Sequence, residues 1–201
     1  SDPATFSKST ETIVRQVADL RGMVDEFSSF ARMPKPSFQD EPILDIVRQS
    51  VFLHEVAHSS VKFSIEQDDP AVSMVCDRRQ ISQALTNIIK NGVEAIVERE
   101  DCENQTGEIV VKVSCPSETT LSIVVSDNGV GLPTERNRLT EPYMTTRVRG
   151  TGLGLAIVKK IVEEHAGTIR FEDRVGGGTV VTLEFDSDRL ATLGSDNDNT
   201  G

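Results

Sequence analysis

The chain has 201 residues, 37% hydrophobic and 26% charged, which is typical of one compact domain with an appended element. Its net charge of −11 and its scattered Lys and Arg residues argue against a nucleic-acid-binding protein, which needs clustered basic side chains. Its 3 widely spaced cysteines give no disulfide framework or zinc knuckle, and no apolar run approaches the ~20 residues that cross a membrane.

Residues 9–31 carry an apolar stripe with the spacing of a coiled coil. The stripe consists of Ile13, Val17, Leu20, Val24, Phe27 and Ala31. Pro34 and Pro36 then stop the helix, so we expect a coiled-coil-like helix within residues 1–33 and a linker over residues 34–39. The stripe favours packing against other helices, although packing on its own domain would also satisfy it.

A second predicted helix, which ends near residue 58, contains His54-Glu55-Val56-Ala57-His58. This is the H-E-x-x-H spacing that holds zinc in metalloproteases. A catalytic zinc needs a third protein ligand, and the only other histidine, His165, lies far along the chain. We interpret the motif as ordinary helix residues and keep the zinc protease as the weakest alternative. His165 ends a later predicted helix, where a positive charge would be favourable.

The rest of the chain alternates strands and helices. Period-two apolar patterns predict strands at residues 61–65, 72–76, 108–114, 120–126, 168–172 and 179–185. Helices are predicted at about residues 78–97, capped by Asp77, and 155–166. The acidic, polar residues 187–201 predict a disordered tail. This order predicts an α/β two-layer sandwich over residues 40–186, with a mixed sheet covered by helices on one face.

One helix face in this region is polar where a core helix should be apolar. Asn87, Lys90, Asn91 and Glu94 follow one another at steps of three and four residues, so they project together. Amide oxygens in this pattern can bind Mg²⁺ between protein and phosphates, but a solvated helix face explains the pattern equally well.

Two glycine-bearing segments follow. Asp127 ends a predicted strand and precedes Gly129 and Gly131, so its carboxylate can accept the exocyclic N–H of adenine and reject guanine; a turn without a ligand is the alternative. Residues 150–154, Gly-Thr-Gly-Leu-Gly, lead into a helix and can cradle a triphosphate, or form only a flexible loop. We interpret residues 132–150 as a mobile lid that carries Arg147 and Arg149 toward a γ-phosphate.

In this order the motifs resemble the ATP-binding catalytic domain of two-component sensor histidine kinases, within the gyrase, Hsp90, histidine kinase and MutL ATPase superfamily. The N, G1, F and G2 boxes and the GxT element resemble residues 87–95, 127–131, 142–146, 150–154 and 177–179. The resemblance covers about residues 40–186 and implies the Bergerat-type ATP-binding fold. Tyr143-Met144 departs from the usual aromatic pair of the F box.

The resemblance implies ATP and Mg²⁺ as ligands, with Asn91 on the metal, Asn87 and Lys90 at the phosphates and Asp127 at adenine. The other implied nucleotide-binding residues are Gly129, Gly131, Thr146, Arg147, Gly150, Gly152, Leu153, Gly154 and Thr179. Related hydrolysing ATPases have a glutamate where this chain has Asn87. An amide cannot activate water, which favours phosphoryl transfer over hydrolysis.

The family's phosphoacceptor motif does not occur in this sequence. Residues 25–36 are similar to nitrogen-regulation kinases of the NtrY type, so residues 1–33 resemble the second helix of a dimerising hairpin. We therefore expect a protein-histidine kinase fragment, the cytoplasmic part of a membrane-bound homodimeric sensor, without nucleic-acid or membrane contacts of its own. The phosphoryl group would pass to a histidine outside this chain and then to a response-regulator receiver domain. A hydrolysing ATPase of the same fold and a nucleotide-binding pseudokinase module remain alternatives.

Overall fold

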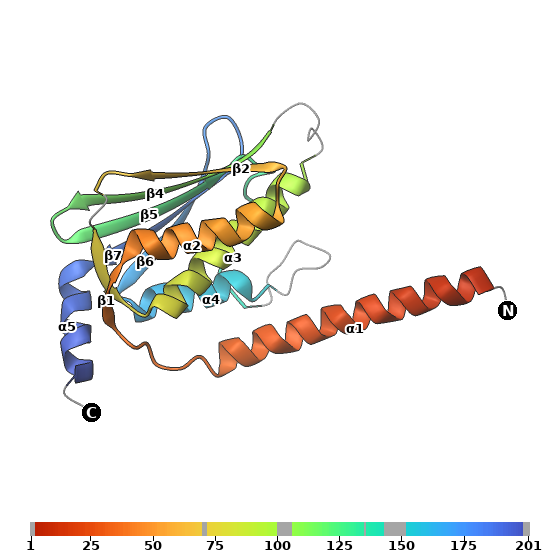
Figure 1. Ribbon diagram of the computed structural model, residues 1–201, viewed down its shortest axis with the longest axis horizontal. Helices are drawn as coiled ribbons and strands as arrows, with labels where there is room; N and C mark the ends of the chain where they lie inside the picture. Colours follow the sequence, from red (N-terminus) through yellow and green to blue (C-terminus); the bar gives the residue numbers. More distant parts are fainter. Residues whose placement is uncertain (1–2, 70–71, 100–105, 135, 143–151, 199–201) are drawn as a thin grey trace.

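The computed structural model describes residues 3–69, 72–99, 106–134, 136–142 and 152–198. The elements along the chain are α1 (Pro3–Ala31), β1 (Gln39–Pro42), α2 (Ile43–Ala57), β2 (Val61–Gln67), β3 (Ser73–Cys76), α3 (Arg78–Val97), β4 (Gly107–Ser117), β5 (Thr120–Asp127), the 3-10 turn η1 (Arg136–Arg138), α4 (Gly154–Glu164), β6 (Gly167–Asp173), β7 (Thr179–Asp186) and α5 (Ser187–Asp198). Figure 1 shows a layered body from which α1 extends to one side.

The main sheet has five strands in the order β2-β4-β5-β7-β6. β2 pairs with β4 in parallel, and the other neighbouring strands pair antiparallel, so the sheet is mixed. Helices α2, α3 and α4 lie against the same face of this sheet (Figure 1). The predicted two-layer α/β sandwich is therefore confirmed.

Sheet and helices meet through matching apolar patterns. In β4, Ile109, Val111 and Val113 are buried, and the residues between them are only half-buried. The core side of α3 contributes Ile81, Leu85, Ile88 and Ile89. Because the strand pattern repeats every second residue and the helix pattern about every 3.6 residues, each element buries one face in a shared core.

The strands on either side of Asp68 and Asp69 belong to different sheets. β2 joins the edge of the main sheet with Val61 opposite Gly107, whereas β3 pairs with β1 in a separate two-stranded sheet. Parallel pairing of β2 with β4 needs a long crossover, which α3 provides. The β1 strand starts at Gln39, one residue inside the predicted linker.

The prediction of a disordered tail is wrong for residues 187–198, which form α5. The side chain of Leu190 is completely buried, and Leu193 packs on the same core. The Asp186 carboxylate accepts the backbone N–H of Arg189 at 3.0 Å at the start of this helix. The segment is polar overall, so its two leucines, spaced by three residues, gave no clear helix signal in the sequence. Packing on β3 and β7 stabilises the helix.

Helix α1 exposes its apolar stripe. Ile13, Val17, Leu20 and Val24 are each about 60% exposed. The C-terminal end of α1 contacts the body, where Lys160 lies over the ring of Phe30 at 5.5 Å from its centroid. None of the helices among the described residues has both the length and the apolarity that a membrane crossing requires.

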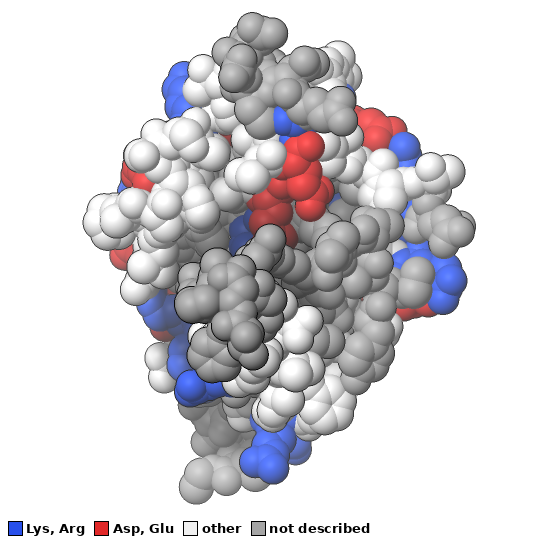
Figure 2. Space-filling view, turned by 90° about the vertical axis from the view of Figure 1, so that its right-hand side faces the viewer, with Lys and Arg blue, Asp and Glu red and all other residues white. Residues whose placement is uncertain are grey.

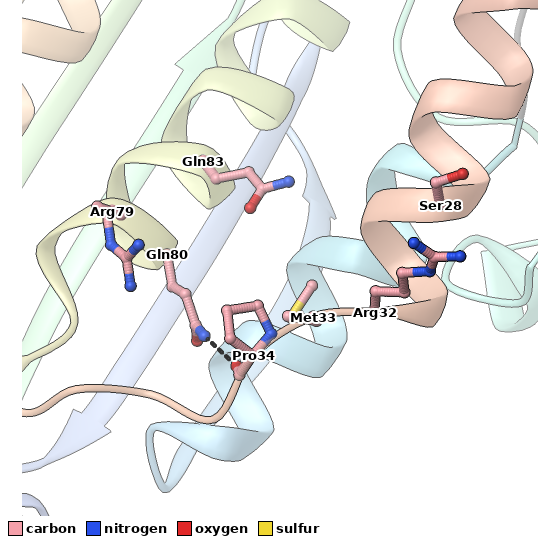
Figure 3. Close-up of a pocket in the computed structure, with 7 residues that line it drawn as sticks. All are labelled: Ser28, Arg32, Met33, Pro34, Arg79, Gln80 and Gln83. Carbon is pink, nitrogen blue, oxygen red and sulfur yellow. Dashed lines mark hydrogen bonds between the residues drawn. The ribbon is translucent and has the colours of Figure 1, made fainter.

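A cavity lies where the linker passes between the end of α1 and the start of α3. Its lining comes from Ser28, Arg32, Met33, Pro34, Arg79, Gln80 and Gln83 (Figure 3). Gln80 donates from Nε2 to the carbonyl oxygen of Pro34 at 2.9 Å, which attaches the linker to the first turn of α3.

His165, at the C-terminal end of α4, contacts the other end of the linker. The ring is fully buried, accepts the backbone N–H of Asp77 at Nε2 (3.0 Å) and donates from Nδ1 to the carbonyl oxygen of Ile161 (2.8 Å). Phe38 of the linker meets the ring edge-on at 5.2 Å. Burial lowers the pKa of His165 below its ordinary value of 6.5. The prediction of a positively charged histidine at this helix end is therefore wrong, because a ring with this lowered pKa is neutral at pH 7.

We expect the free energy of unfolding to fall as the pH is lowered through about 6.5, since only the unfolded chain then binds a proton at His165. The loss should stop below the pKa of the folded histidine. His165→Gln keeps a donor and an acceptor but cannot titrate, so its profile should be flatter. Urea denaturation from about pH 8 to pH 5 measures this. Burial also lowers the pKa of His54, so the contribution of His165 is the difference between the stability profiles of the unmodified chain and His165→Gln. Identical profiles for the two proteins would contradict the expectation.

Candidate functional site

Helix α3 starts at a side-chain cap made by Asp77. Asp77 is buried, and its Oδ1 accepts the backbone N–H groups of Arg79 (2.9 Å) and Gln80 (3.2 Å). Burial raises the pKa of Asp77, but these bonds, one from the Ser37 N–H and one from the Arg79 guanidinium hold it below 3.8. The cap fixes the start of α3 and therefore the direction of its side chains.

The polar face of α3 lies where the spacing predicts it. Asn87, Asn91 and Glu94 are half-buried and Lys90 is exposed, whereas Ile88 and Ile89 point into the core. Asn87 donates from Nδ2 to the carbonyl oxygen of Gly154 at 3.3 Å. This contact brings the N box beside the G2 box, 67 residues further along the chain.

Helix α4 begins at Gly154 with features of an anion-binding helix end. Gly152 has a φ of +69°, and Leu153 is buried as the N-cap residue without a side-chain hydrogen bond. The first turn contains no acidic residue. The N–H groups of a first helical turn and the positive end of the helix dipole favour a bound anion.

Asp127 ends β5 with its side chain 6% exposed. Its Oδ1 accepts the backbone N–H of Gly129 at 2.8 Å. A Cβ atom on Gly92 of α3 would lie 3.3 Å from the Asp127 Cβ, so α3 approaches the aspartate closely. Gly92 was not among the predicted site residues, although a glycine inside a helix costs about 1 kcal/mol and signals such an approach.

The two loops beside Asp127 need glycine for steric reasons. A Cβ atom on Gly129 would lie 2.5 Å from the backbone carbon of Ala95 in α3. Gly131 and Gly178 have φ angles of +84° and +104°, and a Cβ atom on Gly178 would overlap the carbonyl oxygen of Asp127. Gly178 lies within the predicted GxT element, residues 177–179, but was not among the predicted nucleotide-binding residues. Its left-handed backbone and its contact with Asp127 appear only in the folded chain.

The structure thus gathers segments from four parts of the sequence. The end of β5, the start of α4 and the polar face of α3 meet, and buried Thr179 follows Gly178 at the start of β7. The predicted site residues Thr146, Arg147 and Gly150 lie outside the described residues, as do residues 135 and 143–150 of the predicted lid. Figure 2 views the end of the molecule where β5 stops and α4 begins, with a group of acidic side chains near its centre and basic ones around it.

The H-E-x-x-H motif lies elsewhere, at the end of α2. The rings of His54 and His58 stack at 6.2 Å, nearly parallel at 14°. Burial, His58 and Lys90 lower the pKa of His54. His165, the third histidine, is instead hydrogen-bonded to Asp77 and Ile161. Within the described part of the chain, no group of three or more His, Cys, Asp or Glu side chains is placed to hold a metal ion.

Comparisons with known proteins agree with this geometry. Residues 76–189 match the family model of the histidine kinase-, DNA gyrase B-, and HSP90-like ATPases. The nitrogen regulation protein NtrY of Azorhizobium caulinodans is 52% identical over 177 residues, which cover 88% of this chain and 23% of that protein.

Solved structures agree as well. The catalytic domain of histidine kinase ThkA superposes with a TM-score of 0.66 at 28% identity, covering 75% of this chain and 95% of that domain. ThkA in complex with the response regulator TrrA gives a TM-score of 0.74 at 26% identity, covering 93% of this chain and 53% of the ThkA chain. The chain spans less than a third of the length of the curated relatives, 23% of NtrY and 30% of the NtrY-like kinase of Rickettsia bellii.

Proposed function

Because the chain belongs to the histidine kinase-, DNA gyrase B- and HSP90-like ATPase family and forms the ATP-binding catalytic domain of an NtrY-like sensor histidine kinase, we propose that it binds ATP with Mg²⁺ around α3 and phosphorylates a histidine outside this chain. The observation that carries the proposal is the convergence of Asn87, Gly154, Asp127 and Gly178 from distant segments. The chain's part in the reaction is to position the nucleotide and neutralise its charge.

Asp127 recognises adenine in this proposal. Its carboxylate is almost buried, so a mismatched hydrogen bond there is costly. Adenine presents an amino group that donates to the carboxylate, whereas guanine presents a carbonyl oxygen that repels it. A Cβ atom on Gly131 would lie 3.5 Å from the carbonyl oxygen of Gly178, and Thr179 follows Gly178, so both residues line the base site in this proposal.

In this proposal the phosphates and Mg²⁺ lie nearer the start of α3 than the base does. The Asn91 side-chain oxygen binds the metal, and Asn87 and Lys90 face the phosphates. The first turn of α4, after Gly152, receives phosphate oxygens on its backbone N–H groups. Asn87 is an amide and cannot take a proton from water, so the nucleotide survives until a histidine attacks the γ-phosphorus.

The proposal extends to partners and location. The exposed apolar stripe of α1 fits a homodimer in which a further helix supplies the phosphoacceptor histidine. The solved complex of ThkA with TrrA supports a receiver domain as the acceptor of the next transfer. We place the chain in the cytoplasmic part of a membrane-bound sensor, with no nucleic-acid or membrane contacts of its own.

Titration with a non-hydrolysable ATP analogue tests the metal site. We expect the unmodified chain to bind at least about tenfold more tightly with Mg²⁺ than without it, and Asn91→Ala to lose most of that difference because a hard oxygen ligand is removed. Gln83→Ala, on the same helix beside the linker, is the matched control and should keep the Mg²⁺ effect. Equal Mg²⁺ dependence of Asn91→Ala and the unmodified chain would remove Asn91 from the metal site.

Phosphotransfer is tested by supplying the acceptor hairpin of an NtrY-like kinase with γ-labelled ATP. Acid-labile label on its histidine supports the proposal. Steady phosphate release without labelled histidine would instead indicate a hydrolysing ATPase, and binding without either product a nucleotide-binding module.

A further inference from the structure

Asn128, the residue after Asp127, anchors its loop through its whole side chain. It is 8% exposed. Its Oδ1 accepts the backbone N–H of Glu108 at 2.8 Å, and its Nδ2 donates to the carbonyl oxygen of Thr106 at 2.9 Å. Its backbone N–H donates to the Glu108 carbonyl oxygen at 3.2 Å. The amide therefore continues the β4–β5 pairing past its last pair, Ile109 with Asp127.

These contacts are part of a chain of interactions that leads from Asn128 through Glu108, Arg174 and Gly178 back to Asp127. The side chain of Glu108 accepts from the Arg174 guanidinium at 2.7 Å, and the Arg174 backbone N–H donates to the Gly178 carbonyl oxygen at 3.0 Å. Gly178 in turn lies directly against the Asp127 backbone. Hydrogen bonds linked in this way stabilise one another, so the loop has one preferred geometry.

The end of α3 holds the same loop from the other side. Arg99 donates from its guanidinium to the carbonyl oxygen of Asn128, and Val130 donates from its backbone N–H to the Ala95 carbonyl oxygen at 3.1 Å. Neighbouring residues of an extended strand point in opposite directions. While Asn128 is tied to the start of β4, Asp127 must therefore point the other way, toward Gly92 of α3.

We propose that Asn128 is a positioning residue that fixes the direction of the Asp127 carboxylate and thereby sets the preference for adenine over guanine. The inference rests on the proposed nucleotide-binding function. A carboxylate turned away from the base loses its hydrogen bond to adenine and its repulsion of guanine together. In the proposed function, α3 and α4 make the interactions with phosphate and Mg²⁺, and this loop makes none of them.

The test is the ratio of dissociation constants for non-hydrolysable GTP and ATP analogues, measured with Mg²⁺ on the unmodified chain, Asn128→Asp and Asn128→Ser. Aspartate has the same size but places an oxygen against the Thr106 carbonyl, and serine is too short to reach both partners. We expect the GTP/ATP ratio to fall at least about tenfold in both variants, while Mg²⁺ still tightens binding.

Partial unfolding cannot imitate this result, because it weakens both nucleotides by the same factor and leaves their ratio unchanged. Ile123→Val is the matched control, since it removes a methyl group from the core of β5 without touching the loop. Its ratio should equal that of the unmodified chain.

An unchanged ratio in Asn128→Asp and Asn128→Ser, with both nucleotides weakened equally, would show that Asn128 only stabilises the fold and would overturn the inference while leaving the proposed function in place. Failure of the unmodified chain to bind either analogue, or to prefer ATP, would overturn both.

Discussion

Asp127→Asn is expected to weaken ATP-analogue binding on the order of 100-fold, ~2.7 kcal/mol, and to shift the preference toward GTP. The reason lies in the bond that Asp127 already makes. Its Oδ1 accepts the Gly129 N–H at 2.8 Å, so the oxygen of an asparagine would be held there. The NH₂ group would then face the base, where it opposes the adenine amino group and can donate to the guanine carbonyl.

Isothermal titration with non-hydrolysable ATP and GTP analogues measures both halves of this expectation. Asp45→Asn is the matched control, because it removes the same charge from an exposed position on α2. It should bind both nucleotides like the unmodified chain. If Asp127→Asn kept its ATP affinity, the base would not lie at this carboxylate.

Gly178→Ala is expected to destabilise the domain and to abolish measurable ATP binding. Two effects combine at this position. Its φ of +104° is one that a residue with a Cβ atom rarely adopts, which costs about 1–3 kcal/mol. In addition, the new Cβ atom would overlap the Asp127 carbonyl oxygen and lie 2.7 Å from the Asn128 Cα. Relieving that overlap must move the loop that carries the adenine-binding carboxylate.

Gly177→Ala separates the two effects. Gly177 has a φ of +105°, but a Cβ atom there would meet no atom within 4 Å. In this variant only the unfavourable backbone conformation should lower the free energy of unfolding, which urea denaturation measures. ATP binding, measured by nucleotide titration, should be kept. Equal losses in Gly177→Ala and Gly178→Ala would mean that backbone strain alone matters and that the contact with Asp127 does not.

Local pattern was sufficient to place much of the candidate site on the right elements. The spacing of Asn87 and Asn91 specifies one helix face wherever the helix lies, and Asp127 follows an alternating strand whose end is visible in the sequence. The order of the motifs also sufficed for the fold class and the family.

Gly92 and Gly178 lie within the predicted N box and GxT element, but their steric roles were not predicted, because the atoms that exclude a Cβ come from other segments. Both glycines contact Asp127, which is distant from each in the sequence. Likewise, the neutral state of His165 follows from its burial, and the ring accepts the backbone N–H of Asp77, which is distant in the sequence.

Periodicity and motif order along the chain decide which faces of α3, β5 and α4 are apolar and which carry chemistry, since those depend on residues a few positions apart. Folding alone decides that β2 and β3 join different sheets and that Leu190 orders the acidic C-terminal segment into α5. Strand partners and burial are set by contacts between residues far apart in the sequence, and their free energy exists only once those residues meet.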